Sequence, residues 1–427
     1  MELLPKDQLV FDEMKNTIEK NYRKHGFLPI DTPVLEKKEV LLAKGGGETE
    51  KQVYELERGH TEMAMRFDLT VPLARYVAMH FPDLNFPFRR YHIGKVYRGE
   101  RNQKGRFREF YQCDIDIIGN GKLALTNDGE IPAVIADTFK DLGFEAFTIH
   151  INNRKILNGF YGSLGIKDTV SVLRTVDKLD KIGPDKVKEE LLDLGLAEDG
   201  AQRILDFIGI SGTNQEIIQA LRDLKIDNET FTRGLEELQE VLSYARAFGV
   251  GEDHLAVDLS IARGLDYYTG TVYETILDDY PEIGSICSGG RYENLAEHYT
   301  NQPLPGVGIS IGLSRLYYQL EEAGLLKDYQ TQLMDLLLIP MDDCIEETVA
   351  LLGRLRQEGV QASLYGEKGK MGKKFKYADQ EGYPYVLVVG PDELKHQTFT
   401  LRNMVTGQEE ALKEDQIPDF LKGARKN

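Results

Sequence analysis

FRRYHIGKVYRGERNQKGRFREFYQCDIDIIG, residues 88–119, is the stretch from which the fold is predicted. Its two outer parts are rich in aromatic and β-branched residues, which are typical of strands. The first part ends with Ile93, Val96 and Tyr97, and the second begins at Phe110. We therefore predict two strands joined by a long loop. The loop is basic: it contains Arg98, Arg101, Lys104, Arg106 and Arg108.

The basic loop stands out because the 427-residue chain has a formal net charge of −18. Arg98 and Arg106 lie at the two ends of the predicted hairpin, from where both can reach one cleft. Two guanidinium groups aimed at one cleft suit a polyphosphate. The alternative is a solvated surface hairpin, the usual explanation for an isolated run of charge. That alternative must also account for Asp114 and Asp116, which continue the polar pattern along the second strand.

Composition limits the class of protein. A chain of 427 residues is long enough for about two or three domains. A hydrophobic content of 41% and a charged content of 29% are typical of a soluble globular protein. The acidic balance argues against non-specific adhesion to nucleic acid, although a local basic patch can still bind it.

Cysteine and histidine usage gives no indication of a metal site. The three cysteines are far apart, and the sequence contains neither CxxC nor HExxH. A reduced cytosolic protein is the simplest interpretation. The N-terminus, MELLPKDQLVFDEM, is acidic and amphipathic, so we expect neither a signal peptide nor a transmembrane span.

Polar residues cluster at two further places. Arg66, Asp68 and Thr70 alternate along an expected strand, where the carboxylate and hydroxyl would form an acceptor pair for an ammonium group. A polar face of an edge strand explains the pattern equally well. The segment 255–261 alternates as another expected strand and ends in RGLDYYTG, residues 263–270. By themselves, its arginine and paired tyrosines could be core residues and a cap.

Several motifs together resemble one family. YRGERNQKGRFREFYQCDIDIIG resembles motif 2 of class II aminoacyl-tRNA synthetases, in the form found in histidyl-tRNA synthetases. RGLDYYTG and SICSGGRYENL (285–295) resemble the two histidine-specific motifs of that family. GVGISIGLSRLYYQL (306–320) resembles motif 3, and GFLPIDTPVLE (26–36) resembles motif 1.

The chain departs from the family pattern in three places. Glu293 stands where GGRY is usually followed by Asp, and Asp68 stands where bacterial members commonly have Glu. The family usually opens with a short RG-x-x-D segment, which MELLPKDQ lacks. The first two departures are conservative.

The resemblance implies a mixed α/β (α+β) fold. It implies an antiparallel-sheet class II synthetase catalytic domain over 1–326, with a helical insertion at 162–250, and a C-terminal α/β anticodon-binding domain over 333–427. Helical spacing of Leu, Ile and Ala in 162–250 agrees with the insertion. Alternating strands and helices after Leu326 predict parallel pairing in the last domain.

The activity implied is that of a histidine–tRNA ligase. Histidine would be activated by ATP and then transferred to tRNA(His). ATP with Mg²⁺ is expected as substrate rather than as a tightly bound cofactor. We expect a cytoplasmic homodimer without membrane contact. Five lysines between 368 and 376 either contact RNA or begin a solvated helix.

The resemblance also assigns residues to the ATP and tRNA ends of the site. Arg98 and Arg263 would be the catalytic cations at the α-phosphate. Three residues would face the acceptor end of the tRNA: Arg101, Gln103 and Lys104. The remaining ATP contacts would be Arg106 and Arg315 on the outer phosphates, Phe110 stacked on adenine, and Glu100 hydrogen-bonded to it.

Histidine would be bound by a second group of residues. Arg98 and Arg263 would also reach its carboxylate. Asp68, Thr70 and Gln112 would take the ammonium group. The imidazole pocket would be lined by Asp116, Tyr267, Tyr268 and Tyr292, since a carboxylate and a phenol suit the two ring nitrogens.

Two rival interpretations share the fold. A histidine-sensing regulatory paralog, such as the regulatory subunit of ATP phosphoribosyltransferase, generally lacks the C-terminal domain and some pocket residues. A synthetase for threonine, proline or glycine would share motifs 2 and 3 but lack RGLDYYTG with GGRY. The chain keeps these motifs and a C-terminal α/β segment, which favours the histidine enzyme.

Overall fold

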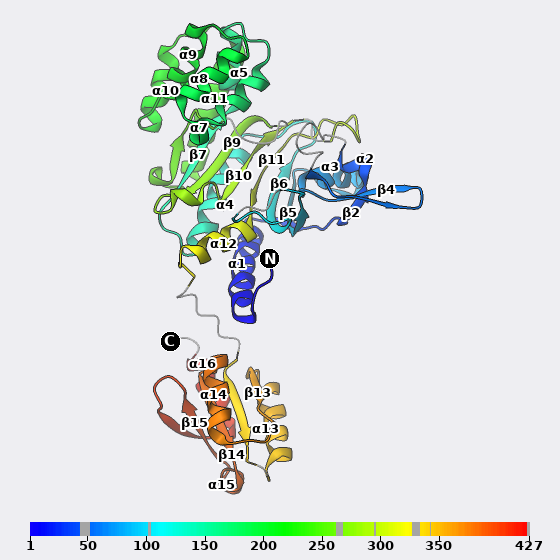
Figure 1. Ribbon diagram of the computed structural model, residues 1–427, viewed down its shortest axis with the longest axis vertical. Helices are drawn as coiled ribbons and strands as arrows, with labels where there is room; N and C mark the ends of the chain where they lie inside the picture. Colours follow the sequence, from blue (N-terminus) through cyan, green and yellow to red (C-terminus); the bar gives the residue numbers. More distant parts are fainter. Residues whose placement is uncertain are drawn as a thin grey trace. The chain divides into compact units, whose positions relative to one another are not determined.

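The computed structural model describes residues 1–42, 52–100, 104–261, 268–293, 296–326, 334–341 and 343–424. The chain forms two compact units, unit 1 (Met1–Asp328) and unit 2 (Tyr329–Asn427), coloured from blue to yellow and from yellow to red in Figure 1. Each unit is described by itself.

An eight-stranded sheet forms the centre of unit 1, in the order β1-β5-β6-β11-β10-β9-β7-β8. The two outermost pairs are parallel and the others are antiparallel, so the predicted antiparallel sheet is confirmed. Its strands are β1 (Leu28–Pro29), β5 (Phe88–Tyr97), β6 (Glu109–Ile118), β7 (Phe147–Asn153), β8 (Leu255–Val257), β9 (Tyr268–Leu277), β10 (Cys287–Tyr292) and β11 (Gly306–Ile311).

The predicted hairpin is the β5–β6 pair. Its register runs from Phe88 opposite Ile118 to Tyr97 opposite Glu109. Because side chains alternate across a strand, β6 has two different faces. One face puts Cys113, Ile115 and Ile117 into the core, where each is fully buried. The other face carries the polar residues of β6, which become important at the site.

Helices α1 (Pro5–Lys24), α4 (Thr126–Asp141) and α12 (Leu313–Glu322) lie together beside the central strands (Figure 1). Tyr22 of α1 donates a hydrogen bond to the carbonyl oxygen of Cys113, at 2.9 Å. The Phe11 ring lies 5.5 Å from the rings of both Tyr111 and Tyr317, measured between centroids. These aromatic contacts hold α1 and α12 against β6.

The alternation expected at Arg66, Asp68 and Thr70 is wrong. A small antiparallel sheet contains β2 (Leu35–Lys37), β3 (Glu55–Arg58) and β4 (Thr61–Met65), and β4 ends before these residues. Thr70 instead begins α3 (Thr70–Met79), and Asp68 accepts a hydrogen bond from the backbone N–H of Val71 at 3.1 Å. A carboxylate that satisfies a free N–H at a helix start stabilises the helix.

Arg66 and helix α2 connect the small sheet to its surroundings in unit 1. The guanidinium of Arg66 bonds to the carbonyl of Lys95 at 2.8 Å and lies 3.1 Å from the carboxylate of Asp31. Helix α2 (Lys38–Leu41) packs on α3 through Leu41 and Val71.

The strand expected over 255–261 is shorter than predicted. It ends at Val257, and the chain then turns, with the N–H of Ile261 donating to the carbonyl of Asp258 at 3.4 Å. The side chain of Asn152 donates to the carbonyls of both Leu259 and Ile261, at 3.4 and 3.2 Å. These bonds replace strand pairing, although both apolar side chains remain buried.

The segment between β7 and β8 is helical, as predicted, and is green in Figure 1. Glycines let the last of its helices lie close to its neighbours. A Cβ on Gly159 would lie 2.4 Å from the backbone nitrogen of Phe231, and a Cβ on Gly129 would lie 2.2 Å from the Cβ of Tyr244. The helices are α5 (Arg154–Ser163), α6 (Thr169–Val176), α7 (Leu179–Ile182), α8 (Pro184–Asp193), α9 (Glu198–Ile208), α10 (Asn214–Asp223) and α11 (Glu229–Ala247).

Unit 2 is a five-stranded sheet in the order β13-β12-β14-β15-β16. Strands β13 (Ala362–Leu364), β12 (Leu336–Pro340) and β14 (Tyr385–Val389) are parallel, as predicted. Strands β15 (Thr398–Asn403) and β16 (Glu409–Lys413) are antiparallel, so the expected parallel pairing is incomplete. The short turn between them leaves no room for the helical crossover that a parallel pair requires.

Four helices pack against this sheet: α13 (Ile345–Gln357), α14 (Met371–Glu381), α15 (Pro391–His396) and α16 (Ile417–Ala424). The lysine cluster lies at α14 and just before it. Four of its members are exposed, but Lys374 is buried and donates to the carbonyl oxygen of Pro340 at 3.3 Å. Lys374 therefore does not belong to an RNA-contacting surface, contrary to its place in the predicted cluster.

Candidate active site

A cavity of about 440 Å³ opens over the polar face of β6 in unit 1. A smaller cavity of about 20 Å³ adjoins it, since both are lined by Thr70, Asp114, Tyr268 and Ser310. The walls come from the β5–β6 hairpin, the start of α3, strands β9 to β11 and the first turns of α12. Segments that lie far apart in the sequence thus meet at one place.

Three guanidinium groups line the larger cavity. Arg98 follows β5, Arg106 lies in the hairpin loop and Arg315 lies in the first turn of α12. The Cζ of Arg98 lies 5.2 Å from the centroid of the Phe110 ring, and its Nε donates to the carbonyl oxygen of Phe67 at 3.0 Å. Such a convergence of cations suits a polyanionic ligand.

The other two arginines are held by neighbouring oxygens. Arg106 donates to the carboxylate of Glu100 at 3.0 Å, and its side chain remains 49% exposed, so that it is free to turn toward a ligand. Arg315 and Gln319, one turn apart on α12, both donate to the carbonyl of Ile283, at 3.2 and 2.9 Å. This shared carbonyl fixes the side of α12 that faces the cavity.

Three residues that line the larger cavity carry buried acceptor oxygens. Within the described part of the chain, Oδ2 of Asp68, Oε1 of Gln112 and Oδ1 of Asp114 have no hydrogen-bond partner, although all three are buried. Burial raises the pKa of Asp68 to about 6, against the opposing effects of the Val71 N–H and Arg98. Burial likewise raises the pKa of Asp114 to about 7. The site is therefore ready to accept hydrogen bonds from a cation.

The smaller cavity has a neutralised carboxylate at its floor. Asp116 forms an ion pair with the fully buried Arg90 and accepts a hydrogen bond from the hydroxyl of Tyr292, at 2.8 Å. Burial raises the pKa of Asp116, while Arg90 and Tyr292 act in the opposite direction. A polar, hydrogen-bonded floor of this kind suits a small polar ring.

Glycine makes room for these side chains. A Cβ on Gly308 would lie 2.3 Å from Oδ1 of Asp116 and 2.3 Å from the carbonyl oxygen of Ile115. A Cβ on Gly306 would lie 2.4 Å from the Tyr292 ring. Both glycines lie on β11, next to β6, so the pocket depends on their lack of a side chain.

Family models match almost the whole chain. The histidyl-tRNA synthetase model matches residues 1–316, and the anticodon binding domain model matches residues 335–424. The chain belongs to the histidyl-tRNA synthetase family. The resemblance and the fold class predicted from the sequence are thus confirmed.

Individual relatives agree with this assignment. The chain is 57% identical over 425 residues to a histidine–tRNA ligase from Clostridium tetani, covering 99% of this chain and 97% of that protein. It is 53% identical over 422 residues to a histidine–tRNA ligase from Finegoldia magna, covering 99% and 98%. The crystal structure of histidyl-tRNA synthetase from Nostoc sp. PCC 7120 superposes with a TM-score of 0.91 at 38% identity, covering 99% and 97%.

A more distant structure shows the same fold only. An ATP phosphoribosyltransferase regulatory subunit/histidyl-tRNA synthetase from Bacillus halodurans superposes with a TM-score of 0.74 at 21% identity. It covers 91% of this chain and 96% of its own. At this level of identity, similarity of fold does not carry similarity of activity.

The structure brings most of the predicted site residues together. The larger cavity is lined by Asp68, Thr70, Arg98, Glu100, Arg106, Phe110, Gln112, Tyr268 and Arg315. Asp116 and Tyr292 line the smaller one. Arg263, Tyr267, Arg101 and Gln103 lie outside the described residues.

Lys104, which was predicted to face the acceptor end of the tRNA, lies outside the lining of both cavities. Its side chain is 87% exposed, and its Nζ lies 3.3 Å from the carboxylate of Glu322 on α12. An exposed pair of this kind is weak and easily exchanged.

Sequence reasoning did not assign a role to Asp114, Arg90, Ser310 or Gln319. Asp114 could have been found, because Gln112, Asp114 and Asp116 alternate and so share one face of β6. Arg90 could not, since only the strand register places it opposite Asp116.

The described residues give no indication of a metal site or of a membrane span. They contain no group of three or more His, Cys, Asp or Glu placed to hold a metal ion. They contain no helix both long and apolar enough to cross a membrane. The three cysteines are free and buried.

Proposed function

We propose that this chain is a histidine–tRNA ligase, which activates L-histidine with ATP and transfers it to tRNA(His). The observation that carries the proposal is a cavity lined both by three arginines, Arg98, Arg106 and Arg315, and by residues with buried, unpaired acceptor oxygens. Similarity over nearly the full chain to curated histidine–tRNA ligases supports it.

The first step joins histidine to the α-phosphate. A carboxylate oxygen of histidine forms a bond to the α-phosphorus, the bond from that phosphorus to the β-phosphate bridge breaks, and pyrophosphate leaves. Positioning and positive charge supply most of the catalysis in such a transfer. We assign Arg98 to the α-phosphate and the carboxylate, with Arg263 as the second catalytic cation. Mg²⁺ would enter with the phosphates, whose charge it neutralises, and we assign it no protein ligand.

We assign the remaining nucleotide contacts to the walls of the larger cavity. Arg106 and Arg315 would take the outer phosphates, and Glu100 would bond to adenine. Phe110 would stack on adenine. Because the guanidinium of Arg98 already lies over one face of the Phe110 ring, the adenine would use the other face. Arg106 would then exchange its bond to Glu100 for the phosphate.

Histidine would lie deeper, between the two cavities. Asp68, Thr70 and Gln112 would take its ammonium group. The imidazole ring would be bound at Asp116, Tyr292, Tyr268 and Tyr267. Since Arg90 already compensates the charge of Asp116, the floor favours the neutral imidazole over the imidazolium cation.

The second step transfers the histidyl group to tRNA. The 2′- or 3′-hydroxyl of the terminal adenosine attacks the carbonyl carbon of the adenylate, and AMP leaves with the phosphate oxygen. Arg101, Gln103 and Lys104 would face this end of the tRNA. Residues 1–326 would be the catalytic domain, 162–250 its insertion and 333–427 the anticodon-binding domain.

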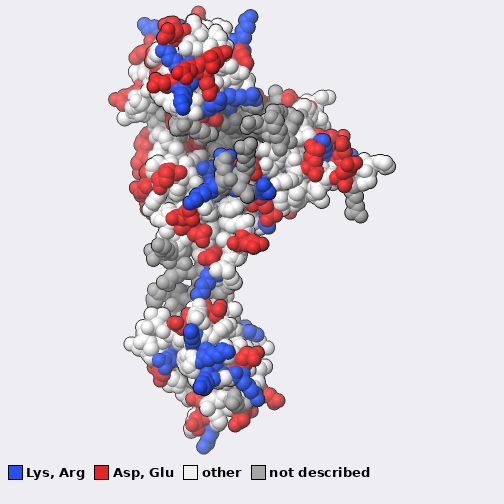
Figure 2. Space-filling model, in the orientation of Figure 1, with Lys and Arg blue, Asp and Glu red and all other residues white. Residues whose placement is uncertain are grey.

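Unit 2 would contact the anticodon end of the tRNA. Figure 2 shows Lys and Arg side chains gathered on the face of unit 2 turned to the viewer. The exposed lysines at and before α14 are Lys368, Lys370, Lys373 and Lys376. Phosphate contacts from such lysines add affinity that decreases with salt.

We further propose that the enzyme is a cytoplasmic homodimer.

ATP–pyrophosphate exchange with each of the twenty amino acids tests the first step. We expect exchange with histidine alone, followed by charging of tRNA(His). Arg98→Met should abolish exchange, while Arg203→Met, at an exposed position of α9, should leave it unchanged. Histidine binding without exchange would refute the ligase and favour the regulatory paralog, which the family models and curated relatives do not favour.

A further inference from the structure

We propose that Asp114 is a further ligand of the substrate's ammonium group, so that this group is held by two carboxylates, Asp68 and Asp114, together with Gln112 and Thr70. The inference rests on the proposed function, because it concerns the amino acid bound at the same site. It follows from three buried, unpaired acceptor oxygens on residues that line one cavity, and from the hydrogen bonds that leave two of them unpaired.

The sheet aims Asp114 at the cavity. Asp114 lies between Gln112 and Asp116 on the polar face of β6, and each of these three residues lines one or both cavities. Its cross-strand neighbours on this side are Ser310 on β11 and, one strand further, Ser288 on β10. Both of these neighbours are small, and Asp114 lines both cavities although its side chain is buried.

A directed chain of hydrogen bonds leaves the acceptors free. The Nε2 of Gln112 donates to the hydroxyl oxygen of Ser310 at 2.9 Å, and the Ser310 hydroxyl in turn bonds to Asp114. Because the hydrogen bonds run in this direction, Oε1 of Gln112 and Oδ1 of Asp114 remain as unpaired acceptors. Oδ2 of Asp68 is the third, and none of the three has a partner within the described residues. An ammonium group has three N–H donors, which matches them in number.

Charge balance points to the same ligand. Arg90 forms its ion pair with Asp116, which leaves Asp68 and Asp114 without an ion-pair partner among the described side chains. Burial raises the pKa of Asp114, because an ionised carboxylate without a counter-ion is costly in the protein interior. An ammonium group between the two carboxylates supplies the missing positive charge.

The alternative is that Asp114 is only an internal polar group that supports the sheet through Ser310. The two possibilities differ in what they predict for ligands. A ligand of the ammonium group discriminates between molecules with and without that group. A residue that merely supports the sheet affects all ligands alike.

The experiment compares Asp114→Asn with Asp116→Asn in the full-length protein, using calorimetric binding of three probes. L-Histidine and histamine carry the ammonium group, whereas 3-(imidazol-4-yl)propionate lacks it. We expect Asp114→Asn to raise the Kd of the first two at least tenfold and to leave that of the third within twofold. Asp116→Asn, at the imidazole floor, should weaken all three.

Kinetics gives an independent readout. In ATP–pyrophosphate exchange, Asp114→Asn should raise the KM for histidine at least tenfold with little change in the KM for ATP. Equal weakening of the three probes, or of none, would overturn the inference. If the Asn variant does not fold, Asp114→Ser gives the same comparison with a smaller side chain.

The two proposals fail in different ways. If the wild-type protein neither binds histidine nor exchanges pyrophosphate, the proposed function is wrong. If the wild type does both but Asp114→Asn does not separate the probes, only the role of Asp114 is wrong.

Discussion

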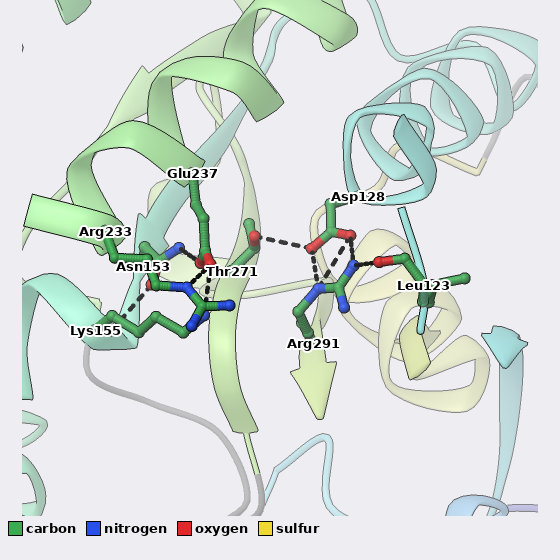
Figure 3. A network of polar contacts seen from close by, with 8 residues as sticks. All are labelled: Leu123, Asp128, Asn153, Lys155, Arg233, Glu237, Thr271 and Arg291. Carbon is green, nitrogen blue, oxygen red and sulfur yellow. Dashed lines mark hydrogen bonds and ion pairs between the residues drawn. The ribbon is translucent and has the colours of Figure 1, made fainter. Parts of the chain in front are cut away.

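Replacing Arg291 by methionine should destabilise unit 1 through the carboxylate that it leaves behind. Arg291 of β10 and Asp128 of α4 form the ion pair at the right of Figure 3. Its Nε and Nη2 bond to the two carboxylate oxygens at 2.9 and 2.7 Å, and Nη2 also donates to the carbonyl of Leu123 at 2.9 Å. The two side chains are only 6% and 0% exposed.

The size of the expected loss in the free energy of unfolding follows from this burial. After Arg291→Met, Asp128 keeps one side-chain partner, the hydroxyl of Thr271 at 2.9 Å, and no counter-ion among the residues of the network. Breaking a buried pair by removing one partner costs about 3–5 kcal/mol. Because Tyr292 follows Arg291 and donates to Asp116, we also expect a higher KM for histidine.

The assay is urea unfolding of the full-length protein, with the transition of unit 1 followed separately. A matched control lies at the left of Figure 3: Arg233 pairs with Glu237 at 3.1 Å, but its side chain is 68% exposed. Arg233→Met should cost only about 0.3–0.5 kcal/mol. The double variant Asp128→Leu/Arg291→Met should recover much of the loss, since it leaves no buried charge.

Two results would refute this reasoning. A loss below about 1 kcal/mol for Arg291→Met would mean that water reaches Asp128 or that the carboxylate takes up a proton at little cost. A double variant as unstable as Arg291→Met would mean that packing around the guanidinium, rather than charge, determines the loss.

Three further predictions concern other parts of the chain. The pKa of Asp114 is raised from 3.8 to about 7 by burial. Its ionisation therefore lowers the stability of the folded protein as the pH rises between these two values. Asp114→Asn should stabilise the ligand-free protein by up to about 4 kcal/mol at pH 8 but little at pH 4. The melting temperatures of both proteins at the two pH values test this, and a difference independent of pH would contradict it. Gly308→Ala places a Cβ against Asp116 and against the backbone carbonyl of Ile115, so the KM for histidine should rise at least tenfold and the melting temperature should fall. An unaltered KM would mean that the pocket relaxes. Lys373→Ala should reduce the slope of log K for tRNA binding against log salt concentration by about one, without changing stability. Lys374→Ala should instead lower the melting temperature of unit 2, because Lys374 is buried. The reverse pattern would argue against an RNA-binding face.

The pattern of neighbouring residues predicted those helices and strands that are determined mainly by their own sequence. The β5–β6 hairpin was expected from its aromatic and β-branched residues, and the helices of 162–250 from apolar spacing. The same reasoning failed at Asp68 and Thr70. Alternation over five residues cannot show that a carboxylate caps a following helix, because the competing hydrogen bond to Val71 is invisible in the pattern.

Pairing between distant segments was beyond the sequence. Strand β8 ends early because the side chain of Asn152, about a hundred residues away in the chain, binds the carbonyls that follow the strand. Strands β15 and β16, by contrast, are neighbours in the chain, and the short turn between them makes the pair antiparallel. Lys374 could not be separated from its exposed neighbours until α14 was placed against Pro340.

The sequence by itself determined the family, the antiparallel sheet and the residue types of the site, since motifs and apolar periodicity are properties of neighbouring residues. Only the tertiary structure decided which carboxylate each cation neutralises. Arg90 is opposite Asp116 through strand register, and Asp114 is left without an ion-pair partner among the described side chains. Charge compensation in a buried site depends on distances of a few ångströms between separate strands, and such distances exist only after the sheet has formed.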